Sequence, residues 1–276
     1  MQKIQGYTKR VSSDCFVYCP GRMLFNTAWK IQENIASKIA VGEHPPALLL
    51  LEHPHTFTLG RRGQIKNLLW SRDQLARKKV EVVRVDRGGD ITYHGPGQLV
   101  GYPILPLAPI TWKSEKAEHI PGDLCFKVPQ VDYVGYIRKL ELILNQTLSS
   151  FHIHSYLLDG LTGIWVNAEG KTKQSTSSFE GNQKHAKIAS IGVKVDAQGI
   201  TRHGFALNIN PDMEYWKGII ACGLIGYPTA SMSELLDQPP DFWNVIQEVV
   251  AAFSDKFNFH IKMIGSSSKH WRDLLA

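Results

Sequence analysis

Cysteine is scarce in this chain, with four in 276 residues, which excludes a small disulfide-stapled scaffold. The four are Cys15, Cys19, Cys125 and Cys222. Cys15 and Cys19 lie close together, but no second Cys/His pair nearby has the spacing of a zinc site, so we expect structural thiols. Free thiols indicate a reducing compartment, and a cytoplasmic location is the expectation.

Long hydrophobic runs are also missing. No stretch approaches the roughly 18 apolar residues of a membrane helix, and the longest aliphatic run, residues 47–51, indicates a buried strand. The N-terminus carries Lys3, Lys9 and Arg10 but no apolar segment of the kind that a secretory signal contains. We therefore expect no membrane partner.

The formal net charge is +6. A basic protein can bind nucleic acid, but Lys and Arg look scattered along this chain and mixed with acids. An acidic protein partner fits the charge equally well, because complementary fields steer protein encounter. Charge alone does not choose between the two.

Hydrophobic periodicity predicts the elements. Leu24, Ala28, Ile31, Ile35 and Ile39 form a helical stripe, Ser71 opens a short helix with a capping box, and Asp132 caps another helix. Further helices are expected near 212–218, 229–236 and 240–256. Strands are expected at 47–52, 56–59, 80–85, 91–104 with a break at 95–97, 152–158, 163–167, 186–195, 200–209 and 257–264.

Strands and helices alternate here without a regular βαβ rhythm. This favours an α+β fold with a mixed, largely antiparallel sheet and flanking helices, built as a single domain over residues 1–276. Long loops are expected near 106–130, which is rich in proline, and near 169–185, which is rich in Lys, Ser, Thr, Gln and Gly.

One cysteine has neighbours that could expose it. Cys222 is followed by Gly223 and, three residues later, Gly226, which leave room for a ligand and can adopt positive φ. Local features alone nevertheless fit a buried, inert thiol better than a nucleophile.

Lys187 stands at the start of a predicted strand. Strict alternation would place it on the apolar face with Ala189, Ile191, Val193 and Val195, where a lysine needs a charged partner. The alternative is a frayed strand end whose lysine points to water. If Lys187 met Cys222 at ~4 Å, the ammonium and a thiolate would attract by about 4 kcal/mol at an effective dielectric of 20. Such a pair would activate the thiol.

The densest motif is Arg-Gly-Gly-Asp-Ile-Thr-Tyr-His-Gly-Pro-Gly-Gln at residues 87–98. Its glycines let backbone approach a ligand, and Arg87 can hold a loop or an anion. The motif lacks the Gly-Lys-Ser/Thr end of a Walker A loop, and two successive hairpin turns would also explain the glycines.

Histidines offer weaker candidates. His203 shares a predicted strand face with Phe205, which fits a hydrogen-bonded core histidine. His53 with His55, and His152 with His154, each place two imidazoles on one strand side, but no further ligand is tied to either pair by spacing. We expect no metal.

These motifs together resemble the octanoyl-carrier-protein:protein N-octanoyltransferases, the lipoate biosynthesis protein B family. The resemblance runs in order through His53-Pro54, 58–62, 87–103, 163–166, 187–193, 203–209, 222–224 and 229–235, and covers most of residues 20–255. Two departures stand out. Ala221 occupies a position where the family usually has Pro, and Asp90 one where Gln or Lys is more usual.

The resemblance implies a fold similar to the catalytic domains of biotin and lipoate protein ligases, and transfer of octanoyl from acyl carrier protein to a lysine of lipoyl domains. It implies a thioester on Cys222, activation by Lys187 and a supporting role for His94 in orientation or proton transfer. The implied substrate-binding residues are Arg87, Gly88, Gly89, Asp90, Ile91, Thr92, Tyr93 and His94, then Ser190, Ile191 and Gly192, then Gly204, Phe205 and Ala206.

The resemblance also implies the partners. They are octanoyl-acyl carrier protein, the lipoyl domains of 2-oxoacid dehydrogenase complexes and the H protein of glycine cleavage, with no nucleic acid. No cofactor is implied, because the acyl group arrives on the carrier's phosphopantetheine arm. An apolar tunnel beside residues 93–97 is expected to hold the chain, and backbone N–H groups near Gly192 or Gly223 to hold the oxyanion.

Three alternatives stay open at the level of sequence. An ATP-dependent lipoate or biotin protein ligase of the same fold would need no cysteine. A non-catalytic domain could bind a carrier or nucleic acid through its charge. A hydrolase could pair Cys222 with His94 or His203.

Overall fold

The computed structural model describes residues 14–107, 132–168, 184–265 and 267–275. Its main feature is a mixed sheet of eight strands, in which the first three strands pair in parallel and all later neighbours pair antiparallel. The order across the sheet is β11 (His260–Ile264), β1 (Asp14–Arg22), β2 (Ala47–Glu52), β6 (Gln98–Ile104), β10 (Thr201–Asn208), β9 (His185–Val195), β8 (Leu161–Asn167) and β7 (Tyr156–Leu158).

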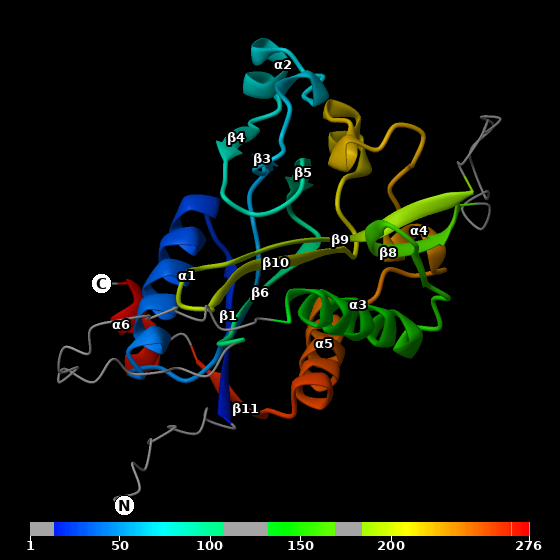
Figure 1. Ribbon diagram of the computed structural model, residues 1–276. Helices are drawn as coiled ribbons and strands as arrows, with labels where there is room; N and C mark the ends of the chain where they lie inside the picture. The colour runs from blue at the N-terminus through cyan, green and yellow to red at the C-terminus, as the bar shows by residue number, and fades with distance from the viewer. Residues whose placement is uncertain (1–13, 108–131, 169–183, 266, 276) are drawn as a thin grey trace, which may run out of the picture.

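A second sheet of three strands stands beside one end of the first (Figure 1). Its central strand β3 (Thr56–Leu59) pairs in parallel with β4 (Glu81–Arg84) and antiparallel with β5 (Ile91–His94). The chain passes from β5 directly into β6 of the large sheet through the turn at residues 95–97. The motif at 87–98 therefore joins the two sheets.

Helices cover both faces of the large sheet. Strand β2 shows why its aliphatic run is unbroken: Leu48 and Leu50 pack in the core beneath α3 (Tyr133–Ser150) and α5 (Phe242–Phe257), whereas Leu49 and Leu51 pack beneath α1 (Phe25–Ala40). A strand that is buried on both faces needs apolar residues at every position. Figure 1 shows α1 on one side of the sheet and the α3–α5 pair on the other.

Short helices complete the fold. Ser71 and Gln74 form the predicted capping box at the start of α2, and the Asp132 carboxylate accepts from the Gly135 N–H at the start of α3. The other short elements among the described residues are α2 (Arg72–Arg77), α4 (Met232–Leu235), α6 (Lys269–Leu275) and the 3-10 turns η1 (Ile65–Asn67), η3 (Met213–Gly218) and η4 (Ala221–Gly223).

The predicted fold class is confirmed, with local corrections. Strand β1 and helix α6 are absent from the sequence-based prediction. The predicted strand at 152–158 is β only from Tyr156, and the last strand begins at His260 because α5 continues to Phe257 and ends at Asn258, whose φ is 54°. The predicted helix at 212–218 is a 3-10 turn.

Most of the two expected long loops, at 106–130 and 169–185, lies outside the described residues, as does Cys125. The single-domain organisation stays a prediction. Among the described helices, none combines the length and the apolar character needed to cross a membrane.

Candidate active site

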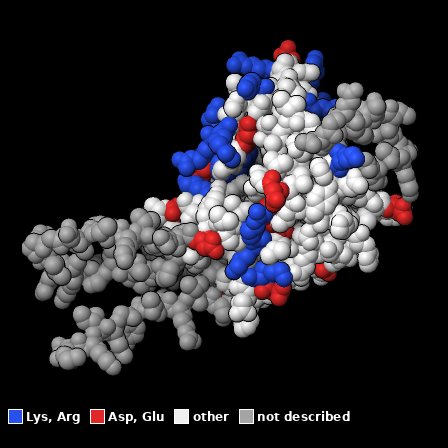
Figure 2. All heavy atoms as spheres, turned by 45° about the vertical axis from the view of Figure 1, so that its right-hand side comes forward, with Lys and Arg blue, Asp and Glu red and all other residues white. Residues whose placement is uncertain are grey.

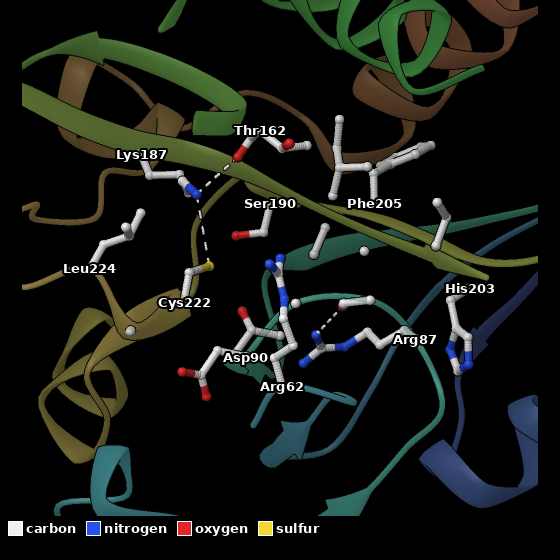
Figure 3. Close-up of a pocket in the computed structure, with 18 of the residues that line it drawn as sticks. Arg62, Arg87, Asp90, Thr162, Lys187, Ser190, His203, Phe205, Cys222 and Leu224 are labelled. Carbon is white, nitrogen blue, oxygen red and sulfur yellow. Dashed lines mark hydrogen bonds between the residues drawn. The ribbon is translucent and has the colours of Figure 1, made fainter. Parts of the chain in front are cut away.

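A pocket of about 740 Å³ opens between the two sheets. Strands β5, β9 and β10 and the 3-10 turn η4 all contribute to its lining. Figure 3 shows Lys187 and Cys222 on opposite walls of this pocket with their side chains pointing toward each other. The pocket therefore brings together residues from the three sequence motifs.

Cys222 occupies a turn with unusual backbone geometry. Its φ is 55°, and that of Gly223 is 68°, so two successive residues are left-handed. A non-glycine residue with positive φ is uncommon and often marks a functional site. The turn, residues 220–223, is tied back to η1 because Ile220 N–H donates to the Asn67 carbonyl at 2.8 Å. The side chain of Cys222 is half-buried, so the inert buried thiol is not what the structure shows.

Lys187 reaches the pocket through a β-bulge. Adjacent residues of β8, Ile164 and Trp165, pair with Ala189 and Lys187, which leaves Ile188 as the extra residue of β9. Adjacent strand residues face opposite ways, so Lys187 and Ala189 lie on opposite faces. The predicted shared apolar face is therefore wrong: Ala189 packs in the core, whereas Lys187 lines the pocket.

The Lys187 ammonium is buried and closely surrounded. The side chain is 6% exposed, which excludes a frayed strand end. Nζ donates to Cys222 Sγ at 3.8 Å and to the Thr162 carbonyl at 3.0 Å, and it lies 4.7 Å from the centre of the Trp165 ring. Gly163 lets β8 pass close to β9 here, since a Cβ at this position would meet the Ala189 carbonyl oxygen at 2.6 Å.

The chemistry follows from these contacts. No carboxylate pairs with Lys187 among the described residues, so a thiolate on Cys222 would be its nearest counter-charge. An ammonium beside a thiol favours the thiolate, which is the nucleophilic form. Carbonyl, ring and thiol together hold the Lys187 ammonium beside the sulfur of Cys222.

Arg87 places a second buried cation in the pocket. Its guanidinium donates to the Thr58 carbonyl at 2.7 Å, to Thr58 Oγ1 at 2.9 Å and to the Gly88 carbonyl at 2.9 Å. Burial lowers the pKa of Arg87, and negative charge on Cys222 opposes that shift. The guanidinium stays charged, because its ordinary pKa is so high. Arg87 therefore shapes the glycine-rich loop and adds positive potential near the sulfur.

Asp90 braces the Cys222 turn. Its Oδ1 accepts from the backbone N–H groups of Gln64 and Ile91, and its Oδ2 accepts from the Asn67 amide at 2.6 Å. A Cβ at Gly223 would meet Asp90 Oδ2 at 2.7 Å, so the turn packs directly on this carboxylate. Asp90 lines the pocket as predicted, but its oxygens are engaged in holding the turn.

Most of the predicted binding residues line the pocket. Ile91 and Tyr93 do not; they belong to a separate core cluster with Phe57 and Trp216, because alternate residues of β5 face opposite ways. The lining residues among the predicted set are Arg87, Gly88, Gly89, Asp90, Thr92, His94, Ser190, Ile191, Gly192, Gly204, Phe205 and Ala206. The expected tunnel wall at 93–97 is thus reduced to His94.

His94 is fixed in place by its neighbours. Its Nδ1 bonds Gln98 Oε1 at 2.9 Å, and its ring stacks against Phe25. Burial, together with the charge of nearby histidines and Arg87, keeps the pKa of His94 well below its ordinary value. A neutral imidazole in this position is a weak base at neutral pH.

His203 lies away from the sulfur, at the far end of the pocket in Figure 3. Its Nε2 contacts Asp86 Oδ1 at 2.7 Å, which matches the predicted hydrogen-bonded core histidine. However, its φ of 57° turns the side chain toward Trp29, away from Phe205 and the core beneath α3. A hydrolase pairing of Cys222 with His203 has no support from this geometry.

The paired histidines do not converge on a metal site. His53 bonds the Met23 carbonyl and the Tyr102 hydroxyl, whereas His55 bonds Tyr93. Within the described ranges, no cluster of three or more His, Cys, Asp or Glu residues has the arrangement of metal ligands.

Several site residues escape sequence reasoning. Thr162 and Trp165 contact Lys187, and Asn67 contacts Asp90, yet none of the three stands out by residue type or periodicity. Thr162 acts through its backbone carbonyl, which no side-chain pattern could reveal. The expected oxyanion donor at Gly223 is also wrong, because its N–H donates to the Ile220 carbonyl at 3.0 Å.

Known proteins match both the sequence and the fold. Residues 25–254 match the family described as the lipoyl protein ligase A/B catalytic domain. A protein of Solibacter usitatus named octanoyltransferase is 38% identical over 80% of this chain and 84% of its own length. One of Koribacter versatilis with the same name is 33% identical over 88% of this chain and 82% of its own length.

Solved structures extend the likeness to three dimensions. A putative lipoate protein ligase from T. acidophilum with bound lipoic acid has a TM-score of 0.63 at 12% identity, over 95% of this chain and 93% of that chain. A bipartite lipoate protein ligase from Thermoplasma acidophilum, studied with its E2 lipoyl domain, has a TM-score of 0.61 at 12% identity, over 95% and 90%. The predicted likeness to lipoate ligase folds is confirmed.

Proposed function

Because the chain belongs to the octanoyltransferases, within the lipoyl protein ligase A/B catalytic family, we propose that it transfers octanoyl to a protein lysine through a thioester on Cys222. It is an acyltransferase enzyme acting in protein lipoylation. The observation that carries the thioester route is the 3.8 Å contact between Lys187 Nζ and Cys222 Sγ.

In the first half-reaction, the Cys222 thiolate attacks the carbonyl carbon of an octanoyl thioester on the phosphopantetheine arm of acyl carrier protein. The carbon–sulfur bond to the arm breaks, and the departing arm thiolate takes up a proton. One thioester replaces another, so the step needs neither ATP nor a cofactor. Lys187, whose ammonium can donate at the sulfur, is the group placed to supply that proton.

In the second half-reaction, the neutral amine of the acceptor lysine attacks the Cys222 thioester. An amide bond forms, the bond to Sγ breaks, and the amine's surplus proton returns to the Lys187–Cys222 pair. Backbone N–H groups near Gly192, which lines the pocket, are the proposed oxyanion donors. The acceptors are lipoyl domains, namely those of 2-oxoacid dehydrogenase complexes and the glycine cleavage H protein. A thiolate nucleophile must stay reduced, which supports the cytoplasm as location.

A ligase is the second candidate, because the structural neighbours carry that name. One assay separates the two. The protein is given an apo lipoyl domain with either octanoyl-acyl carrier protein and no ATP, or free octanoate with ATP. Transferase activity predicts octanoylation only in the first mixture. Octanoylation only in the second would contradict the proposal.

A further inference from the structure

The positive charge of the chain is concentrated in one stretch, residues 61–79, called here the basic segment. Its Lys and Arg residues outnumber its single acid, Asp73, by six, which equals the formal net charge of the whole chain. Elsewhere 24 Lys and Arg residues (31 less 7) are matched by 24 acids (25 less 1), so the expectation of scattered charge fails only in this stretch. The cations are Arg61, Arg62, Lys66, Arg72, Arg77, Lys78 and Lys79.

All of these cations are exposed, and none forms an ion pair with another described residue. Figure 2 shows Lys and Arg gathered on the upper part of the molecule, at the height of α2 and β4 in Figure 1, with few acids among them. Uncompensated cations on one surface produce a field that steers an acidic partner.

The basic segment borders the reacting sulfur. Arg62 and Lys66 line the pocket. Leu68 forms a β-bridge with Ile219, and the Asn67 carbonyl accepts from Ile220, so the segment runs alongside the Cys222 turn. A protein bound to this surface would therefore sit at the entrance to the site.

Exposed aliphatic residues stand among the cations. Ile65 is 64% exposed, Leu69 is 54% exposed, and Ile225, which lines the pocket, is 81% exposed. Apolar side chains surrounded by polar ones are typical of protein docking surfaces, where the apolar part excludes water and the charged rim sets orientation.

We propose that the basic segment is the docking surface for the acyl donor, an acidic acyl carrier protein. This inference rests on the proposed function. The donor's arm carries an anionic phosphodiester, which Arg62 and Lys66 would attract at the pocket mouth. The acceptor lysine side chain carries no anion, so the same cations do not attract it. The surface thus favours the donor through the negative charge of its arm.

The test reverses charge at positions outside the pocket lining. The variant Arg72→Glu/Arg77→Glu changes α2, and the matched control Lys139→Glu/Lys269→Glu changes exposed cations on α3 and α6. The rate of acyl-adduct formation is measured with octanoyl-acyl carrier protein and with octanoyl-pantetheine, which has no protein part. We expect the α2 variant to lose ~10-fold or more with the carrier at low salt and less than about 2-fold with octanoyl-pantetheine.

The control variant should stay within about 2-fold of wild type with both donors, and added salt should narrow the gap between wild type and the α2 variant. Discharge of a preformed adduct by an apo lipoyl domain should be unchanged. Equal carrier rates for wild type and α2 variant would overturn the proposal. The proposal would also be overturned if adduct formation in the α2 variant fell equally with octanoyl-pantetheine, or if only the discharge step slowed. It would be overturned as well if the variant lost only binding to duplex DNA, measured separately. Failure of octanoyl-pantetheine to acylate wild type would instead contradict the thioester route.

Discussion

The two walls of the pocket hold Lys187 and Cys222 by different means. Lys187 comes from β9, a strand paired on both sides within the eight-stranded sheet. Cys222 comes from a short left-handed turn that depends on a few bonds to η1 and on the Asp90 carboxylate. Backbone bonds hold the lysine wall on both sides of Lys187, at the bulge against β8 and through residues 228–230, whereas the cysteine wall depends on individual side chains. Changes behind Cys222 should therefore alter rate without unfolding the protein.

The largest effect on the rate of octanoyl transfer is expected when the ammonium of Lys187 is removed. Lys187→Met keeps the length of the side chain but removes the ammonium beside Sγ, so the rate of octanoyl transfer should fall by ~10² to 10⁴-fold. Steady-state assays with a lipoyl domain measure it. Lys217→Met, at an exposed position, is the matched control. More than a tenth of wild-type activity in Lys187→Met would show that the pairing is not catalytic.

The junction between the two sheets should weaken in acid. His53, at the end of β2, is fully buried, and burial lowers its pKa from 6.5 to about 4. The folded state thus binds fewer protons than the unfolded state. The stability present above pH 6.5 is lost as pH falls toward 4, by ~3 kcal/mol.

Chemical denaturation at pH 7 and pH 4.5 measures this loss. In His53→Gln, the amide can still donate to the Met23 carbonyl but does not titrate. Its stability should fall less steeply over the same interval, although the other buried histidines still contribute. Parallel curves for the two proteins would show that His53 is not the titrating group.

The next prediction concerns the bond between Asn67 and Asp90, which supports the Cys222 turn. Asn67→Ala removes the amide that holds Asp90 behind Gly223, so we expect kcat to fall ~10-fold while KM for the carrier and the melting temperature change little. Asn26→Ala removes another amide–carboxylate bond, an exposed one to Glu81, and serves as control. The rate of alkylation of Cys222 should change in Asn67→Ala alone. An effect on KM with kcat preserved would mean that Asn67 binds substrate instead.

The smallest effect is expected at His94, whose side chain bonds Thr58 and Gln98 and neither Lys187 nor Cys222. Because its imidazole is neutral, His94→Gln should lower kcat by less than ~10-fold and leave the shape of the pH–rate profile unchanged. If His94→Gln lowered kcat more than 100-fold and one limb of the pH–rate profile disappeared, His94 would be a proton-transfer group.

Sequence patterns predicted most of the fold because its elements carry strong periodicity or caps. The stripe of α1, the capping box of α2 and the aliphatic run of β2 each follow from local chemistry. Strand β1 was missed because its neighbours in the sheet, β2 and the distant β11, determine its pairing. Long-range pairing leaves little trace in a short window of sequence.

The site was predicted only in part, because it too depends on contacts between distant segments of the chain. Lys187 was expected to be buried on the core face, and it is buried, but a bulge that alternation cannot reveal turns it into the pocket. Its meeting with Cys222 joins segments 35 residues apart. Asn67 carried no pattern at all, since its role exists only once η1 lies beside the Cys222 turn.

The most direct test of the Lys187–Cys222 account is the intact mass of the protein after brief mixing with octanoyl-acyl carrier protein in the absence of ATP. The account predicts one octanoyl adduct, mapped to Cys222, labile to hydroxylamine, absent in Cys222→Ala and discharged by an apo lipoyl domain. It also predicts that Lys187→Met forms this adduct far more slowly. A wild-type protein that octanoylates the lipoyl domain without ever carrying the adduct would contradict it.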